Sequence, residues 1–426
     1  MTCQLLKAFR ATLLSTAGGS VARLVPVGAL FLGLLAQPAF AQKPAAKKTD
    51  FDDLAKRATA ARESSRIVEA AGLYKKALAL RPRWEEGWWY LGTLNYEADR
   101  YPEALPAFRN LVMLDPKYGP AWALMGLCEF ETKDYKNSFV HLQYGRARGL
   151  GDNQELVNVA RFHEALLLNR RGEYEAAMEL LSSLVARNVV SHDVKVAIGL
   201  ALLRVNFLPS EVDPSKDALI NAAGEAGMLM ALSNFDQAEG AFKQMLKDFP
   251  GAPFLHYAYG DMLSRLSRYE DAESEFREEM KINPDSALPS MELAYIYLRI
   301  RRYQDALPPA QKAVQLAPLG FAGHYLLGRA LLELGNIQES IRELETARRL
   351  GPFSPEIRYS LARAYAKARR PQEAEHERAE FARLNTLLER KKSQSGPQSY
   401  RTSSDRGELG PHVVNEPASP SPPGEH

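Results

Sequence analysis

Cysteine is almost missing from this chain of 426 residues, which has only two, Cys3 and Cys128. A disulfide framework, or a zinc site built on cysteine pairs, needs more thiols than this, so neither can be the basis of the fold. Cys128 lies within an apolar helical pattern, and we expect it to be a small buried residue. Apolar packing must then hold the chain together.

The chain also lacks an excess of either charge. Lys and Arg total 54 and Asp and Glu total 52, which gives a net charge of +2. Binding to nucleic acid relies on a basic field, so nucleic acid is not expected as a partner. The motifs GxxxxGK[ST], HExxH and GxSxG are missing, as is a GxGxxG that follows a strand. We therefore expect no enzyme activity and no cofactor or metal.

The apolar run Leu24–Ala36 is too short for a bilayer span, which needs ~20 residues. It follows the basic residues Lys7, Arg10 and Arg23, and small residues around Ala41 suit a cleavage site. This layout predicts a secretory signal peptide over residues 1–41, with a retained membrane anchor as the alternative. Cleavage removes three basic and no acidic residues, which leaves 51 basic against 52 acidic residues. A periplasmic or extracellular protein without an integral membrane span is expected.

The chain does have a sequence period of 34 residues, which we call the 34-residue beat. Large apolar residues recur at this stride in two groups, and a small residue stands three positions after each. They are Tyr101 and Tyr135, then Phe235, Tyr269, Tyr303 and Ile337. A proline usually follows about fifteen positions later, as at Pro116. A period in this range indicates stacked copies of one supersecondary unit.

One copy, residues 85–118, shows what the unit is. Trp88, Gly92 and Tyr96 fall at helical spacing, and Ala104 and Phe108 resume that spacing after a break. Apolar residues at steps of three and four predict two amphipathic helices. We expect the glycine to let the second helix approach closely.

These residues resemble the tetratricopeptide repeat, with its Trp, Leu-Gly, Tyr, Ala, Phe and Pro positions across 34 residues. The resemblance covers roughly residues 51–388, with copies that start near 51, 85 and 119, then near 219, 253, 287, 321 and 355. It implies an all-α fold, an α-solenoid in which helix-turn-helix repeats form a right-handed superhelix.

The sequence thus divides into six segments. They are a signal peptide (1–41), a flexible leader (42–50), an N-terminal repeat array (51–151), an irregular repeat with a Pro-containing insertion (152–218), a C-terminal array of five regular copies (219–388) and a disordered Pro/Ser-rich tail (389–426). In the irregular stretch, Asp193–Asn206 reads as a first helix whose partner is absent. Pro209 and Pro214 then favour an extended loop. We expect the course of the superhelix to change there, with a hinge as an additional option.

The resemblance also implies a binding groove, because in this family the first helices line the concave side. We call each numbered position within a copy a slot. The resemblance places slots 2, 5, 9, 12 and 13 on that side. The candidate partner-binding residues in these slots are Tyr257, Asp261, Arg265, Tyr295, Arg299, Tyr325, Arg329, Tyr359 and Arg363 in the C-terminal array, with Trp89 and Tyr96 in the N-terminal array. Tyr and Arg dominate binding hot spots. The same residues can equally fill the groove and stabilise neighbouring helices.

The sequence therefore predicts an exported, non-enzymatic scaffold that binds a protein or peptide in this groove, in cell-envelope assembly or export. A self-assembling structural repeat protein and an accessory subunit of an envelope enzyme complex are the alternatives. His256 and His324 share the tryptophan slot of their copies. We expect them to pack between helices rather than to form a paired site. The partner and the oligomeric state stay open.

Overall fold

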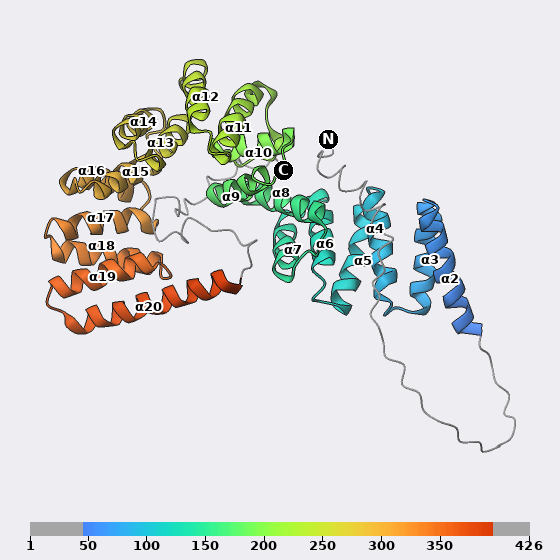
Figure 1. Cartoon of the computed structure of the whole chain (residues 1–426). Coiled ribbons are helices and arrows are strands. Elements are labelled where there is room, and N and C mark those ends of the chain that lie inside the picture. Colours follow the sequence, from blue (N-terminus) through green and yellow to red (C-terminus); the bar gives the residue numbers. More distant parts are fainter. Residues whose placement is uncertain (1–45, 395–426) are drawn as a thin grey trace, which may run out of the picture. The chain divides into compact units, whose positions relative to one another are not determined.

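The computed structural model describes residues 46–394, and in this range the chain consists of α-helices and turns without strands (Figure 1). The all-α class predicted from the sequence is confirmed. The chain divides into two compact units, with the boundary between Glu164 and Ala165. The predicted signal peptide and residues 395–426 of the predicted tail lie outside the described residues.

The N-terminal unit is built from helix pairs. Its helices are α2 (Ala46–Glu63), α3 (Ile67–Leu80), α4 (Glu85–Glu97), α5 (Tyr101–Leu114), α6 (Gly119–Glu131) and α7 (Tyr135–Arg148), and α8 (Gln154–Arg170) contains the unit boundary. The pairs α2–α3, α4–α5 and α6–α7 each pack together. Cys128 is fully buried in α6, as predicted.

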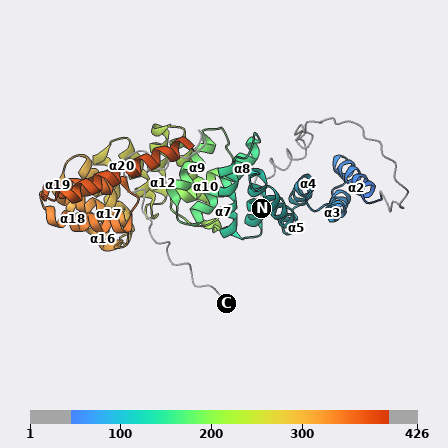
Figure 2. The same cartoon turned by 90° about the horizontal axis from the view of Figure 1, so that it is seen from below.

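The C-terminal unit continues in the same way. Its elements are α9 (Tyr174–Val185), α10 (His192–Leu202), the 3-10 turns η1 (Pro209–Glu211) and η2 (Pro214–Lys216), α11 (Asp217–Ala231), α12 (Phe235–Asp248), α13 (Leu255–Arg265), α14 (Tyr269–Ile282), α15 (Leu288–Arg299), α16 (Tyr303–Leu316), α17 (Phe321–Glu333), α18 (Ile337–Leu350), α19 (Pro355–Lys367) and α20 (Pro371–Gln394). In both views α17 to α20 stack as direct neighbours (Figures 1 and 2).

The 34-residue beat marks the first residue of each second helix, for example Tyr101 of α5 and Tyr303 of α16. Two residues before these positions the backbone is left-handed, with φ of 58° at Asp99 and 60° at Arg301. The next amide then bonds back to the first helix, as from Arg302 N to the Tyr297 oxygen at 2.8 Å. This is a Schellman-type ending that lets the chain reverse within a few residues.

The glycine slot has the predicted role. A Cβ atom placed on Gly92 would lie 2.6 Å from the ring of Phe108, which is fully buried on the second helix of the same repeat. Any side chain at this position would push α4 and α5 apart. The helix pair therefore depends on a small residue in one helix and a large one in the other.

Two segments predicted to be irregular are partly helical. Residues 46–50 of the predicted leader form the start of α2, because Ala46, Lys47 and Lys48 are strong helix formers. Residues 389–394 of the predicted tail extend α20. The predictions of a flexible leader up to residue 50 and of a tail from residue 389 are therefore wrong at these residues.

The helix around residue 193 is not without a partner, contrary to the prediction. α10 packs along α11, which also packs against α12. Pro209 and Pro214 each begin a short 3-10 turn instead of an extended loop, since proline suits the first position of a helical turn. The connection between α10 and α11 is thus long but structured, and the copy near residue 219 has its first helix packed on two neighbours.

Candidate functional site

The first helices of the C-terminal repeats lie in a continuous row. α13 contacts α15, α15 contacts α17, and α17 contacts α19, although a second helix separates each pair in the sequence. Alternate helices that touch one another must lie on the inner side of a curved stack. We use the name first-helix face for the side chains on these four helices that stand in the slots predicted to line the groove.

The structure sorts the predicted residues of this face by exposure. Arg299 is exposed, and the side chain of Arg265 is 51% exposed. Tyr359 is 52% exposed, while Tyr295 and Arg329 are half-buried. These side chains can reach a partner.

Tyr257 and Tyr325 are only 5% exposed, so the prediction that they present surface to a partner is wrong. Each is covered by the first helix of the following repeat. The Tyr257 hydroxyl faces Glu292 of α15 at 3.4 Å, and Ser360 of α19 bonds to Tyr325. Burial raises the pKa of both phenols, so both stay neutral and act as packing groups.

Three arginines of the face are stacked on tyrosines four residues earlier in the same helix. The guanidinium carbon lies 5.9 Å from the ring centroid for Arg299 on Tyr295, and 5.6 Å for Arg329 on the buried Tyr325. It lies 5.9 Å away for Arg363 on Tyr359. The spacing of four residues places the two side chains one above the other, and the ring attracts the cation. Each ring thus lies within cation–π distance of the guanidinium group on the next turn of its helix.

Positive charge is in excess on this face. Its slots hold five cations, Arg265, Arg299, Arg329, Arg363 and Lys367, and three carboxylates, Asp261, Glu333 and Glu356. Asp261 accepts a hydrogen bond from Arg265 at 2.8 Å, and Glu333 pairs with Arg363 at 2.8 Å. These carboxylates fix two of the arginines in place but do not neutralise the face.

The predicted residues of the N-terminal unit behave differently. Trp89 is half-buried and packs edge-on against Tyr118, with ring centroids 5.2 Å apart. Tyr96 is fully buried next to Tyr101, so the prediction that it lines an open groove is wrong. Desolvation raises the pKa of the nearby Glu97 to about 7, against the opposing charge of Arg62. This surface is apolar, with a carboxyl group that titrates near neutrality.

The two histidines of the tryptophan slot pack between helices, as predicted. His256 Nδ1 lies 2.7 Å from Glu275 Oε2, and His324 Nδ1 lies 2.6 Å from Glu343 Oε2. His324 Nε2 also donates to the Pro318 carbonyl at 3.1 Å, as Trp88 Nε1 donates to the Pro82 carbonyl at 2.8 Å. Within residues 46–394 no group of His, Cys, Asp and Glu side chains is arranged to hold a metal ion.

His324 should make stability depend on pH. Both of its ring nitrogens face acceptors. The bond to Glu343 raises the pKa of His324 above the ordinary 6.5 and the bond to the Pro318 carbonyl adds to this, while desolvation by burial and the charge of Arg349 lower it. A raised folded pKa stabilises the fold fully below pH 6.5, and this contribution is lost as the pH rises through the folded pKa. The free-energy difference between wild type and His324→Gln should therefore shrink from pH 6 to pH 9, as measured by urea denaturation. In a Glu343→Gln background the difference should change less with pH, because only the bond to the Pro318 carbonyl then raises the pKa of His324. A constant difference in the wild-type background would contradict the assignment.

A family model described as tetratricopeptide repeat matches residues 55–119, 228–287, 267–321 and 325–380, just over half of the chain. No curated protein matches the chain. Among solved structures, MamA from Desulfovibrio magneticus RS-1 is 20% identical, with 39% of this chain and 94% of MamA covered and a TM-score of 0.37.

Two further structures are similar. YrrB, described as a TPR protein with an unusual peptide-binding site, is 17% identical, with 40% of this chain and 88% of YrrB covered and a TM-score of 0.35. Yeast Tom70 is 14% identical, with 79% of this chain and 92% of Tom70 covered and a TM-score of 0.29. Among the described helices, none combines the length and apolar character needed to cross a bilayer.

Proposed function

Because the chain belongs to the tetratricopeptide repeat family, whose repeats form scaffolds suited to protein–protein interaction, we propose that it is a non-enzymatic scaffold. Its ligand is an extended segment of another protein, which binds on the first-helix face of the C-terminal unit. The observation that carries this proposal is the row of arginines stacked on tyrosines, of which Arg299 and Tyr359 are exposed. Rigid aromatic rings and planar guanidinium groups bind a partner at low entropic cost.

The proposal includes the place of action. The basic residues and apolar run within residues 1–41 support export, and the scaffold then serves cell-envelope assembly or export from the periplasm or cell surface. N-terminal sequencing of the protein from its own cells checks this. A start at Gln42 supports export with cleavage, and a protein that still starts at Met1 contradicts cleavage.

The binding face is tested by removing its stacked arginines. The triple variant Arg299→Ala, Arg329→Ala, Arg363→Ala should lose at least about tenfold of the bound partner, since the hot-spot side chains are gone. The partner is recovered by crosslinking in native envelopes and measured by quantitative mass spectrometry.

A matched control changes three arginines on the second helices, Arg342, Arg378 and Arg383, to alanine. Their side chains are 69%, 58% and 54% exposed, and each pairs only with a glutamate of its own helix in the described contacts. This control should keep the partner at the wild-type level. Equal recovery by both triple variants would refute the proposed face.

A further inference from the structure

Three exposed apolar side chains near the end of the described chain stand in one slot of successive repeats. Leu319, Phe353 and Leu387 follow one another at the 34-residue stride, and they are 80%, 78% and 47% exposed. In the copies that start near 51, 85, 119, 219 and 253, the same slot holds Arg83, Lys117, Gly151, Gly251 and Asp285. The apolar character of this slot is therefore confined to the last three repeats.

Two of these side chains lie on the same edge of the helix stack. Leu319 and Phe353 each stand two residues before a first helix, in the turns that lead into α17 and α19. The chain reverses once between α17 and α18 and once more between α18 and α19, and each of these helices packs along the next. Two reversals bring α19 to begin at the edge where α17 begins. Exposed apolar groups that gather on one edge mark an interaction site.

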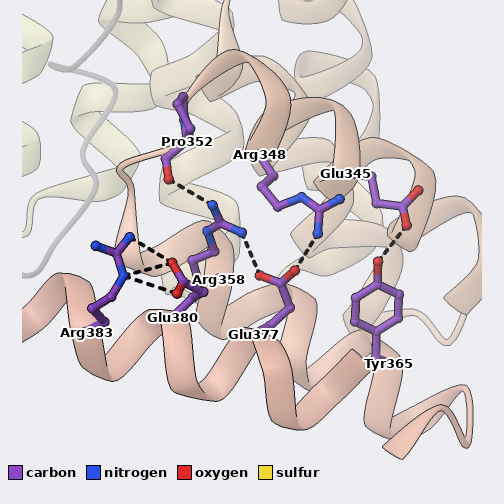
Figure 3. A network of polar contacts seen from close by, with 8 residues as sticks. All are labelled: Glu345, Arg348, Pro352, Arg358, Tyr365, Glu377, Glu380 and Arg383. Atoms are coloured by element: carbon purple, nitrogen blue, oxygen red, sulfur yellow. Dashed lines mark hydrogen bonds and ion pairs between the residues drawn. The ribbon is translucent and has the colours of Figure 1, made fainter. Parts of the chain in front are cut away.

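The last helix returns to this edge and passes it. Arg358, near the start of α19, donates to Glu377 of α20 and to the Pro352 carbonyl, which directly precedes Phe353 (Figure 3). α20 begins in the same slot as α18 but has 24 residues instead of 14, and its end extends beyond the start of α19 (Figure 1). At about 1.5 Å per residue, this extension is roughly 15 Å long. Leu387 stands on it.

The extension of α20 is basic. Residues 385–394 contain Arg390, Lys391 and Lys392 but only one carboxylate, Glu389. Arg349, in the last turn of α18 before the turn of Phe353, is exposed as well. The edge thus combines apolar side chains with an excess of positive charge. Apolar burial together with attraction to anionic lipid is what holds peripheral proteins on a membrane surface.

The exposure of the two turn residues distinguishes between possible occupants. Leu319 and Phe353 are about four-fifths exposed, so their side chains project from the turns and do not line a cleft. The apolar anchors of a protein interface usually fill well-packed pockets that exclude water. A lipid headgroup region is fluid and closes around single projecting side chains, so it does not need such a pocket.

We propose that this edge docks the protein on the surface of an anionic lipid membrane. We call Leu319, Phe353, Leu387 and the basic end of α20 the apolar edge. Its three apolar side chains enter the headgroup region, and its cations pair with lipid phosphates. None of these residues belongs to the first-helix face, so the proposal goes beyond the proposed function and does not depend on it.

The test reads the surroundings of single positions in the full chain. Leu319→Cys, Phe353→Cys and Leu387→Cys are made one at a time in a Cys3→Ser background and labelled with the fluorophore NBD, while Cys128 is fully buried and stays unlabelled. With vesicles of equal parts phosphatidylglycerol and phosphatidylcholine, NBD emission should rise and shift to the blue, because the probe leaves water. Pure phosphatidylcholine vesicles should give a smaller rise, since they carry no net charge.

A matched label separates docking by this edge from other membrane contact. Lys117→Cys carries the probe in the same slot of the N-terminal unit, where the native residue is exposed, and its emission should stay unchanged. Attachment through the apolar run Leu24–Ala36 alone would leave all the labels unchanged, which would overturn the proposal. An equal rise at Lys117→Cys would overturn it too. A rise that needs no vesicles and grows with protein concentration would assign the edge to a second copy of the chain instead of lipid.

Removal of the apolar side chains measures what they contribute. In the protein labelled at Phe353→Cys, the changes Leu319→Ser and Leu387→Ser should lower the affinity for anionic vesicles by at least about tenfold. A control with Val68→Ser and Met113→Ser, both 75% exposed in the N-terminal unit, should bind like the unchanged labelled protein. Equal losses in the two double variants would overturn the role of the edge.

The cations are tested by neutralisation. Arg390→Gln, Lys391→Gln and Lys392→Gln together should weaken binding at low salt by at least about tenfold, since a basic residue near an anionic surface contributes about fivefold. The loss should shrink as salt is added, because salt screens the attraction. A triple variant that binds anionic vesicles as well as the unchanged protein would overturn the charge contribution.

Discussion

Replacing Glu377 with alanine should lower the free energy of unfolding by about 3 kcal/mol, because it leaves two arginines facing each other without their shared anion. Glu377 is 1% exposed on α20. Arg348 of α18 and Arg358 of α19 both donate to its carboxylate, the latter at 3.1 Å (Figure 3). Arg358 also donates to the Pro352 carbonyl at 3.0 Å. One carboxylate thus ties three helices together at the end of the described repeats.

Glu380, one turn further along α20, provides the matched control. It pairs with Arg383 of the same helix at 2.8 Å (Figure 3), and the side chains of Arg383 and Glu380 are 54% and 25% exposed. Exposed ion pairs contribute little, so Glu380→Ala should leave the urea midpoint unchanged. Hydrogen exchange should show faster opening of α18 to α20 in the Glu377 variant alone, because repeats of a solenoid depend mainly on their neighbours. Equal midpoints for the two variants would show that the buried network contributes nothing.

Replacing Gly199 with alanine should destabilise the middle of the C-terminal unit by about 2 kcal/mol through overpacking. A Cβ atom at Gly199 would lie 2.0 Å from the carbonyl oxygen of Ile220 and 2.9 Å from the amide nitrogen of Gly224, both on α11. Backbone atoms inside a helix cannot move aside as a flexible side chain can. α10 and α11 must then separate along their contact.

Replacing Gly240 with alanine should change the free energy of unfolding in the opposite direction. Gly240 is exposed on α12, and a Cβ atom there meets no other atom within 4 Å. Alanine in a helix is favoured over glycine, so Gly240→Ala should stabilise by about 0.5–1 kcal/mol. Urea denaturation of both variants decides the matter. If Gly199→Ala is neutral or stabilising, the close approach of α10 and α11 is wrong.

Much of the fold could be predicted from the sequence because its signals are local. The beat residue Tyr303 begins α16, and Pro318 follows the end of that helix, as the pattern indicates. The left-handed backbone two positions before the first residue of each second helix was not predicted. Asp99, Ser267 and Arg301 adopt it, and these residues share no chemistry that marks this conformation. Only its fixed distance from the beat could have revealed it.

The partner of α10 was missed for a different reason. The connection between Leu202 and Asp217 is longer than a repeat turn, so the 34-residue phase is lost there. Counted by the 34-residue period, the helix that begins at Asp217 belongs only to the repeat that follows it. The glycines that let α10 and α11 pack, Gly199 and Gly224, were the available signal, since small residues at facing positions permit close contact.

The sequence by itself determined the repeat, the start of each second helix in the regular arrays and the family, because hydrophobic periodicity, turn residues and prolines act within a few positions of the chain. Only the tertiary structure decided which residues of one slot reach solvent. Tyr257, Tyr325 and Tyr359 are equivalent in sequence, yet the first two are 5% exposed and the third is 52% exposed. A following first helix covers Tyr257 and Tyr325, whereas none follows Tyr359 among the described residues. The exposure of a groove residue depends on the repeat that follows it. The position of the residue within its own repeat does not indicate whether such a repeat is present.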